Sequence, residues 1–288
     1  MMKKIQVRCP KCLEMGYIQI NDNDVQTNIR GVTGINIMES VICKHAFVVY
    51  IDNNYELRDC FSTDFTIKLP ELKLSEEIAQ DDLIDIDNIN LNLITTNIFA
   101  LTLAYILRAG FYKRRILFLN DNEELNHNFS NFINYCFLDS FDIFIEVKER
   151  WEYNREKKKY KHYIIIENER VIKDKEKIMN PKMMKIESII VQTFLAESDP
   201  KTSIIMLKNE IKKAYHLTKD VSKYIKAAEN IEDLKPKNLM KYLDMKYTQD
   251  VNKYYLKFLI QILINYFNFN LKEKFDFFNL FHWSWYLK

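Results

Sequence analysis

Two pairs of metal-ligating residue types lie near the N-terminus. Cys9 and Cys12 are spaced as Cys-x-x-Cys, and Cys43 and His45 follow as Cys-x-His just before an apolar segment. Two thiolates on a tight turn can share one tetrahedral ion, and a strand places residues i and i+2 on the same side. Four such donors leave no open position for a reactive water. The pattern therefore predicts one structural Zn²⁺ ion held by Cys9, Cys12, Cys43 and His45.

The other cysteines leave alternatives open. Cys9 and Cys12 could instead be a redox pair, although the βαβ context of thioredoxin-like motifs is missing around them. Cys60, on the second strand of an expected hairpin, could replace His45 as the fourth ligand. Cys136 lies in an expected helix and is interpreted as a small buried hydrophobic residue. Five cysteines and no recognisable signal peptide favour a reducing compartment, so we expect a cytoplasmic protein.

The elements around these ligands are expected to be strands. Residues 17–20 alternate between apolar and polar types, and residues 46–59 read as strand, turn, strand with the turn at residues 52–54. The composition then shifts, because seven acidic residues and a single lysine fall between positions 71 and 90. We predict a zinc-binding β module over residues 1–70 and an acidic linker over residues 71–90.

The module resembles a zinc ribbon, because the knuckle Cys9-Pro-Lys-Cys12 matches that family. The resemblance covers about 60 residues and departs from the family at the second knuckle, where Cys43-Lys-His45 stands in place of Cys-x-x-Cys. Zinc ribbons serve as nucleic-acid readers, protein docking sites or structural caps, so the resemblance implies a fold rather than one function.

Residues 91–180 are expected to form a small α/β domain. A hydrophobic helix over 93–110 ends at a glycine, and the run 115–119 suits an internal strand. Asp121 or Asn122 can cap a helix that runs through residue 137, and further strands are expected at 142–147 and 163–167. The order predicts a small sheet flanked by helices.

Residues 181–288 are expected to form a helical domain. A helix follows Pro181, and Ser198 or Asp199 caps a second helix that Pro200 begins. Further helices are expected near 219–229, 237–247 and 250–269. The predicted fold class is α+β, with a zinc-ribbon-like module, a small α/β layer and a C-terminal helical bundle. No segment is both long and apolar enough to predict a membrane span.

The middle region resembles DENN-type modules in the order of its elements. A hydrophobic helix, the basic step Lys113-Arg114-Arg115, a strand, a helix and two strands follow one another as in that family. The resemblance implies a scaffold that binds a small GTPase through surface complementarity, and no catalytic residue is carried over.

A second interpretation is nucleic-acid binding. Residues 207–226 resemble a helix-turn-helix, with a helix near 204–215 and a recognition helix beginning at Lys219. Its exposed face would carry Lys219, Ser222, Lys223 and Lys226. The net charge of +2 provides no overall field for nucleic acid, so any binding would need a local patch. The basic run 157–161 is interpreted as an exposed hairpin tip.

Catalytic signatures are missing from the sequence. It contains no Gly-rich phosphate loop, no Gly-x-Ser-x-Gly and no His-Glu-x-x-His. Carboxylates could still cluster, namely Asp139, Asp142 and Glu146, or Asp52 and Asp59 across the hairpin. The aromatic segment 275–286 is either a buried tail or an anchor for a partner. We expect a non-enzymatic regulatory or scaffolding protein that binds partner proteins, with a zinc-ribbon and helix-turn-helix nucleic-acid binder as the alternative.

Overall fold

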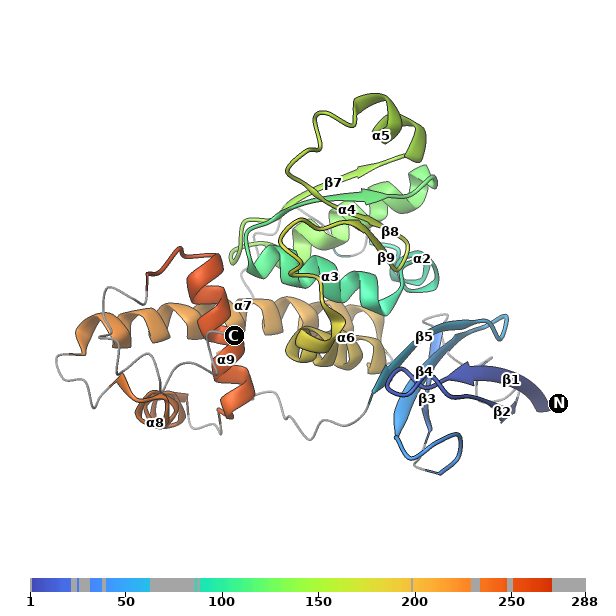
Figure 1. Ribbon diagram of the computed structural model, residues 1–288, viewed down its shortest axis with the longest axis horizontal. Coiled ribbons are helices and arrows are strands. Elements are labelled where there is room, and N and C mark those ends of the chain that lie inside the picture. The colour runs from blue at the N-terminus through green and yellow to red at the C-terminus, as the bar shows by residue number, and fades with distance from the viewer. Residues whose placement is uncertain are drawn as a thin grey trace.

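The structure is a computed structural model that describes residues 2–21, 25, 32–37, 40–62, 86, 89–197, 199–228, 234–247 and 251–270. Small sheets and many helices make up an α+β fold, as predicted (Figure 1). Most of the acidic segment 71–90 and the whole aromatic segment 275–286 lie outside the described residues.

The N-terminal unit consists of two antiparallel sheets. Strands β1 (Met2–Arg8) and β2 (Met15–Asn21) form a hairpin, and β3 (Val32–Ile37), β4 (Phe47–Asp52) and β5 (Leu57–Ser62) form a three-stranded sheet. Alternate residues of both sheets face a shared core, which includes Val7, Ile20, Phe47, Val49 and Ile51. The predicted turn after Asp52 is confirmed, because its carboxylate accepts hydrogen bonds from the backbone N–H groups of Asn54 and Glu56.

The middle sheet has the strand order β7-β6-β8-β9. Strands β6 (Arg115–Leu119), β7 (Phe144–Lys148) and β8 (Ile164–Glu167) are parallel and confirm the three predicted strands, while β9 (Arg170–Lys173) adds an antiparallel edge that was not predicted. The helix α4 (Glu123–Phe137) is capped by the Asn122 side chain, as expected.

The two faces of this sheet are covered by different helices. On β6, Ile116 and Phe118 face the main core, whereas Leu117 and Leu119 face a smaller core that contains Tyr160. Helix α5 (Arg150–Glu156) was not predicted and lies on the side opposite α4 (Figure 1). A strand buried on both faces reads as a continuous apolar run, which explains the pattern of residues 116–119.

The helix expected over residues 93–110 is in fact two helices. Helix α2 (Leu91–Asn97) and helix α3 (Ala100–Phe111) meet at an angle of 104°. Ile98 and Phe99 between them have extended backbone angles. Among the described helices, none reaches by itself the length and apolar character that crossing a membrane requires, and only this bent pair would reach them jointly.

Gly110 lies inside α3 and is not the C-cap that the sequence predicted, because the cap is Tyr112. A Cβ atom at position 110 would come within 2.3 Å of Cε1 of Phe137 on α4. The glycine therefore permits the close approach of the Phe137 ring to α3.

The C-terminal region contains a short 3-10 helix, η2 (Pro181–Met183), and helices α6 (Lys185–Ala196), α7 (Pro200–Ala227), α8 (Pro236–Tyr247) and α9 (Lys253–Asn265). Asp199 caps α7 through the N–H of Thr202, as expected. One hydrophobic core runs from Ile89 in the middle region to Tyr266 after α9, and it also includes Tyr50 of β4.

The predicted helix-turn-helix is wrong. Helix α7 continues through residues 216–219, where the turn was expected. Its buried apolar residues keep a spacing of three or four positions across that point, at Ile204, Leu207, Ile211, Ala214, Leu217, Val221 and Ile225. An unbroken apolar stripe of this kind buries one face of a single long helix, so a turn would interrupt the packing.

Candidate metal centre

The structure brings Cys9, Cys12, Cys43 and His45 together. One potential ligand atom from each residue lies within 4.8 Å of the ligand atoms of the other three. Among the described residues these four make up the one such group of three or more. The four residues that were chosen from sequence spacing could therefore hold a single metal ion.

The distances fit a tetrahedral set of donors. The Sγ atom of Cys9 lies 3.8 Å from Nδ1 of His45, and the Sγ atom of Cys43 lies 3.6 Å from the same nitrogen. A tetrahedral ion with metal–sulfur bonds of about 2.3 Å and a metal–nitrogen bond of about 2.1 Å would separate sulfur from nitrogen by about 3.6 Å. The imidazole thus directs Nδ1 toward the sulfurs.

A tight turn between β1 and β2 presents the first pair of cysteines. The N–H of Leu13 donates to the carbonyl of Cys9 at 2.9 Å, and the N–H of Cys9 donates to the carbonyl of Glu14 at 2.9 Å. Leu13 has a φ of 66°, in the left-handed region, which lets the chain reverse directly after Cys12. The N–H of Lys11 points at Sγ of Cys9 from 3.4 Å, as backbone donors do toward a thiolate.

The thiols respond differently to their surroundings. Burial opposes ionisation of Cys9, but hydrogen bonds from the backbone of Cys12 and Lys11, with the side chains of Cys43 and Cys12, lower its pKa overall. Burial raises the pKa of Cys43 to about 11, and the thiols of Cys9 and Cys12 add to that rise. Thiols that coordinate a metal are deprotonated, so three of them would repel one another. A divalent cation among the three sulfurs would offset that repulsion.

The remaining cysteines lie outside this group. Cys60, the alternative to His45, is half-buried on β5 opposite Val49 and is not a member of the four-residue cluster. Burial, followed by the charge of Asp59, raises its pKa to about 12. Cys136 is fully buried in α4 and packs in the main core, which confirms its interpretation as a small hydrophobic residue.

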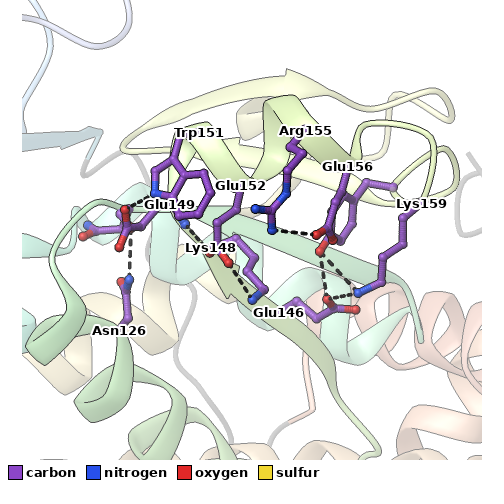
Figure 2. Close-up of polar contacts among 11 residues, drawn as sticks. Asn126, Glu146, Lys148, Glu149, Trp151, Glu152, Arg155, Glu156 and Lys159 are labelled. Atoms are coloured by element: carbon purple, nitrogen blue, oxygen red, sulfur yellow. Dashed lines mark hydrogen bonds and ion pairs between the residues drawn. The ribbon is translucent and has the colours of Figure 1, made fainter.

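The carboxylates that could have clustered do not form a group with metal-ligand spacing among the described residues. Glu146 accepts hydrogen bonds from Lys159 and Tyr163, Asp142 lies beside Lys113 and Tyr266, and Asp139 pairs with Lys212. Figure 2 shows Glu146 directed at Lys159, and it shows a separate contact between Lys148 and Glu152. These carboxylates are therefore used in separate ion pairs and hydrogen bonds on the surface.

Asp52 and Asp59 also have separate roles. Asp52 is buried and binds Nε of Arg58 at 2.8 Å. Asp59 accepts hydrogen bonds from the backbone of Cys60 and of Leu101, the latter in the first turn of α3. The sequence suggests for Asp59 only a possible acidic cluster with Asp52. Its contact with α3 joins segments that are far apart along the chain and could not be inferred from its sequence position.

The basic residues expected to contact phosphates lie on a continuous helix and a turn. Lys219 and Lys226 lie over the rings of Tyr215 and Phe269, and Lys223 pairs with Asp220. Residues 157–161 follow α5 as a turn rather than forming a hairpin tip, although four of the five are exposed.

The resemblances to zinc ribbons and to DENN-type modules stay predictions. Comparisons of the chain with protein-family models, with curated proteins and with solved structures found no match.

Proposed function

We propose that the protein is a non-enzymatic docking scaffold whose N-terminal unit is held together by one structural zinc ion. The cluster of Cys9, Cys12, Cys43 and His45 is the observation that carries this proposal. Three thiolates and an imidazole are soft and intermediate donors that suit zinc in tetrahedral geometry, whereas magnesium and calcium prefer oxygen ligands. Four protein ligands fill the tetrahedron, so the ion has a structural role.

The surface beside this site supports docking. Large hydrophobic side chains are more than half exposed there: Leu13 (55%), Met15 (64%), Tyr17 (56%) and Val41 (56%). Met15 and Tyr17 point to the same face of β2 because they are two residues apart. Exposed aromatic and methionine side chains are enriched at protein interfaces. We infer that these four residues contribute to one docking surface, and we call them the apolar docking face.

Two residues of the docking face lie on the loops that carry the metal ligands. Leu13 directly follows Cys12, and Val41 precedes Cys43 by two residues. The side chain of Ile42 packs on Gly16 of β2, so the second loop lies against the first hairpin. An ion that ties Cys12 to Cys43 would therefore fix the loops that carry Leu13 and Val41, and removal of the ion would disorder these loops.

A photocrosslinking experiment tests the docking proposal. A photoreactive amino acid at position 17 should give one defined protein adduct, which mass spectrometry would identify. The adduct should be lost when Leu13 and Met15 become serine, and also when the metal is removed. The same group at Ile172, an exposed residue of the edge strand β9, is the control. Equal adducts at both positions would contradict the proposal.

The narrower partner class, a small GTPase, rests on the DENN-type resemblance. A binding titration with small GTPases, loaded with GDP or free of nucleotide, tests it. Preferred binding to the nucleotide-free form that requires the apolar docking face would support an exchange regulator. Absence of binding to any of them would remove the GTPase while leaving other protein partners open to the crosslinking experiment.

A second candidate, nucleic-acid binding, is favoured by the same hairpin. Lys4 and Arg8 of β1 face outward on the side of Tyr17, and Lys4 lies 4.6 Å from the centre of the Tyr17 ring. Cations beside an exposed aromatic ring can bind single-stranded nucleic acid. This candidate predicts binding to RNA or single-stranded DNA that weakens with salt and is lost in Lys4→Gln/Arg8→Gln.

A further inference from the structure

A small hollow of about 80 Å³ lies at one edge of the middle sheet. The amino ends of the parallel strands β6 and β8 meet the carboxyl end of the antiparallel strand β9 at this edge, so segments that are far apart along the chain come together there. The lining includes three basic side chains, a histidine and two carboxylates, namely Arg114, Lys161, Lys175, His162, Asp174 and Glu176.

The two carboxylates are held by groups other than the lysines. Oε2 of Glu176 lies 2.7 Å from Nη2 of Arg114. Oδ2 of Asp174 accepts a hydrogen bond from the N–H of Met179 at 2.8 Å, and no cation of the described residues forms an ion pair with Asp174. Neither carboxylate therefore neutralises a lysine of the hollow by direct contact.

The two lysines of the hollow are available to a ligand. Lys161 and Lys175 are exposed, and neither has an ion-pair or hydrogen-bond partner within the part of the chain that the structure describes. Burial, and next the charges of Lys175 and Lys161, lowers the pKa of the neighbouring Lys173. Like charges that lie close together repel one another, and a bound anion would relieve that repulsion.

Two lining residues each have a buried atom without a hydrogen-bond partner. These atoms are Nε of Arg114 and Oδ1 of Asp174, and neither is bonded to any residue that the structure describes. A buried polar atom left unpaired costs free energy. Because Nε is a donor and Oδ1 is an acceptor, a ligand that satisfied both would need an acceptor and a donor of its own.

We propose that the hollow binds the phosphate group of a phosphorylated serine or threonine in a partner protein. A water molecule occupies about 30 Å³ in the liquid, so the hollow has the volume of two or three waters. That volume suits one phosphate group, whereas sites that enclose a whole small molecule measure about 300 Å³ or more. The rest of the ligand must therefore lie outside the hollow.

The charges and the unpaired atoms agree with this ligand. A phosphorylated side chain carries close to two negative charges at neutral pH, which Lys161 and Lys175 match. The main chain beside the phosphorylated residue supplies N–H donors and carbonyl acceptors, the groups that Asp174 and Arg114 lack. The choice of a protein as the source of the phosphate also rests on the proposed docking function.

NMR titration of the full chain with the peptide acetyl-Ala-phosphoserine-Ala-amide tests the proposal. His162 lines the hollow, so its ring signals, which are identified by their loss in His162→Asn, report whether the hollow is occupied. We expect these signals to shift more than those of the other histidines and to follow a one-site binding curve. The same peptide without phosphate should leave them unchanged.

The variant Lys161→Gln/Lys175→Gln removes two charges from the hollow. Its matched control is Lys237→Gln/Lys241→Gln, which removes the same charge from exposed positions on α8. Loss of a charge-assisted hydrogen bond weakens binding by about tenfold, so the hollow variant should bind at least about tenfold more weakly and the control within about twofold. Lys161→Arg/Lys175→Arg should retain binding because it keeps the charge.

Circular dichroism and thermal unfolding should show that these variants keep the fold. Absence of phosphopeptide binding to the wild-type chain, or equal weakening in the hollow variant and the control, would overturn the proposal.

Two further probes separate the sources of a phosphate group. Inorganic phosphate that binds as tightly as the phosphopeptide would overturn the assignment to a protein, because the main chain would then contribute nothing. Co-sedimentation with vesicles that contain a phosphatidylinositol phosphate, lost in the hollow variant and without phosphopeptide binding, would assign the hollow to a lipid headgroup instead.

The hollow and the apolar docking face can be tested separately. Leu13→Ser/Met15→Ser should bind the phosphopeptide as the wild type does, because neither residue lines the hollow. Failure of the crosslinking experiment with retained phosphopeptide binding would remove the docking face and leave the phosphate site. A retained crosslink without phosphopeptide binding would remove the phosphate site alone.

Discussion

The carboxylate of Asp59 accepts a hydrogen bond from the backbone N–H of Leu101, with Oδ2 and N 2.8 Å apart. Asp59 lies on β5 of the N-terminal unit, and Leu101 lies in the first turn of α3. The helix N-terminus has N–H groups with no partner inside the helix, and this carboxylate satisfies one of them. This side chain thus links β5 of the N-terminal unit to α3, in addition to the packing of Tyr50 of β4 in the main core.

This contact predicts that stability depends on the protonation of Asp59. Burial raises its pKa from 3.8 to about 7 and the charge of Glu169 adds to the rise, although hydrogen bonds from Leu101 and Cys60 act in the opposite direction. The folded state therefore binds the proton more tightly than the unfolded state does. The resulting stabilisation is fully present below pH 3.8 and is lost as the pH rises through about 7.

Asp59→Asn should reduce this pH dependence, because an amide keeps an acceptor for Leu101 without becoming charged. Urea unfolding at pH 5.5 and pH 8 would show a smaller fall in unfolding free energy for the variant than for the wild type. Asp139→Asn, at an exposed ion pair, is the control and should behave as the wild type does. Identical pH dependence in all three chains would contradict the role of Asp59.

Replacement of one metal ligand should unfold only the N-terminal unit. Cys12→Ala removes a donor from the cluster, and the free energy of metal binding that supports this unit is then lost. The body has its own hydrophobic core and should keep its helical circular dichroism. Elemental analysis should find about one zinc per chain in the wild type and almost none in the variant.

Cys60→Ala is the matched control for Cys12→Ala, since it removes a thiol outside the cluster. It should retain the metal at the wild-type ratio. Loss of zinc in Cys60→Ala, with retention in His45→Ala, would show that the fourth ligand had been assigned to the wrong residue.

His45→Cys should preserve a tetrahedral site. The substituted thiol stays two residues after Cys43, and four thiolates are an established structural zinc arrangement. In a cobalt-substituted protein, the thiolate-to-metal absorption should increase as three sulfur ligands become four. His45→Ala, which leaves an open position, should weaken binding instead.

The metal ligands could be predicted from sequence because their chemistry is local. A Cys-x-x-Cys turn and a Cys-x-His pair before a strand specify donors at short range, and the structure brings both pairs together. The choice between His45 and Cys60 needed the strand register, because Cys60 pairs with Val49 on β4, away from the loop that carries Cys43. Register depends on the folded sheet, and one sequence leaves it open.

Errors in the helical regions have two different causes. Residues 98 and 99 are neither glycine nor proline, and the break between α2 and α3 accompanies a tertiary contact, the carboxylate of Asp59 at the start of α3. The helix-turn-helix prediction placed a turn before Lys219, although residues 201–227 contain no glycine or proline and their apolar residues are regularly spaced. Tertiary contacts could not be predicted, whereas the continuity of α7 could.

Two unpredicted elements also had local signals. Helix α5 begins with a capping box, in which the side chains of Glu149 and Glu152 each accept a hydrogen bond from the backbone N–H of the other residue. Strand β9 follows a tight turn in which Asn168 has a φ of 51°, a conformation that asparagine tolerates well.

The Arg108–Glu187 pair predicts a large asymmetry between single and double substitutions. Both side chains are almost fully buried, at 7% and 1% exposure, and the pair joins α3 to α6. Glu187→Gln would leave the Arg108 guanidinium buried without its carboxylate, which should cost about 3–5 kcal/mol of unfolding free energy.

Arg108→Met/Glu187→Leu should recover much of that loss, because a buried ion pair can be replaced by apolar groups at little cost. The exposed pair Arg150–Glu167 provides the control, since Glu167→Gln should cost less than about 1 kcal/mol. Chemical denaturation of the four chains measures these differences. A double variant as unstable as Glu187→Gln would show that the pair contributes through its specific hydrogen bonds to the carbonyl groups of η2 and its neighbours, rather than through charge neutralisation.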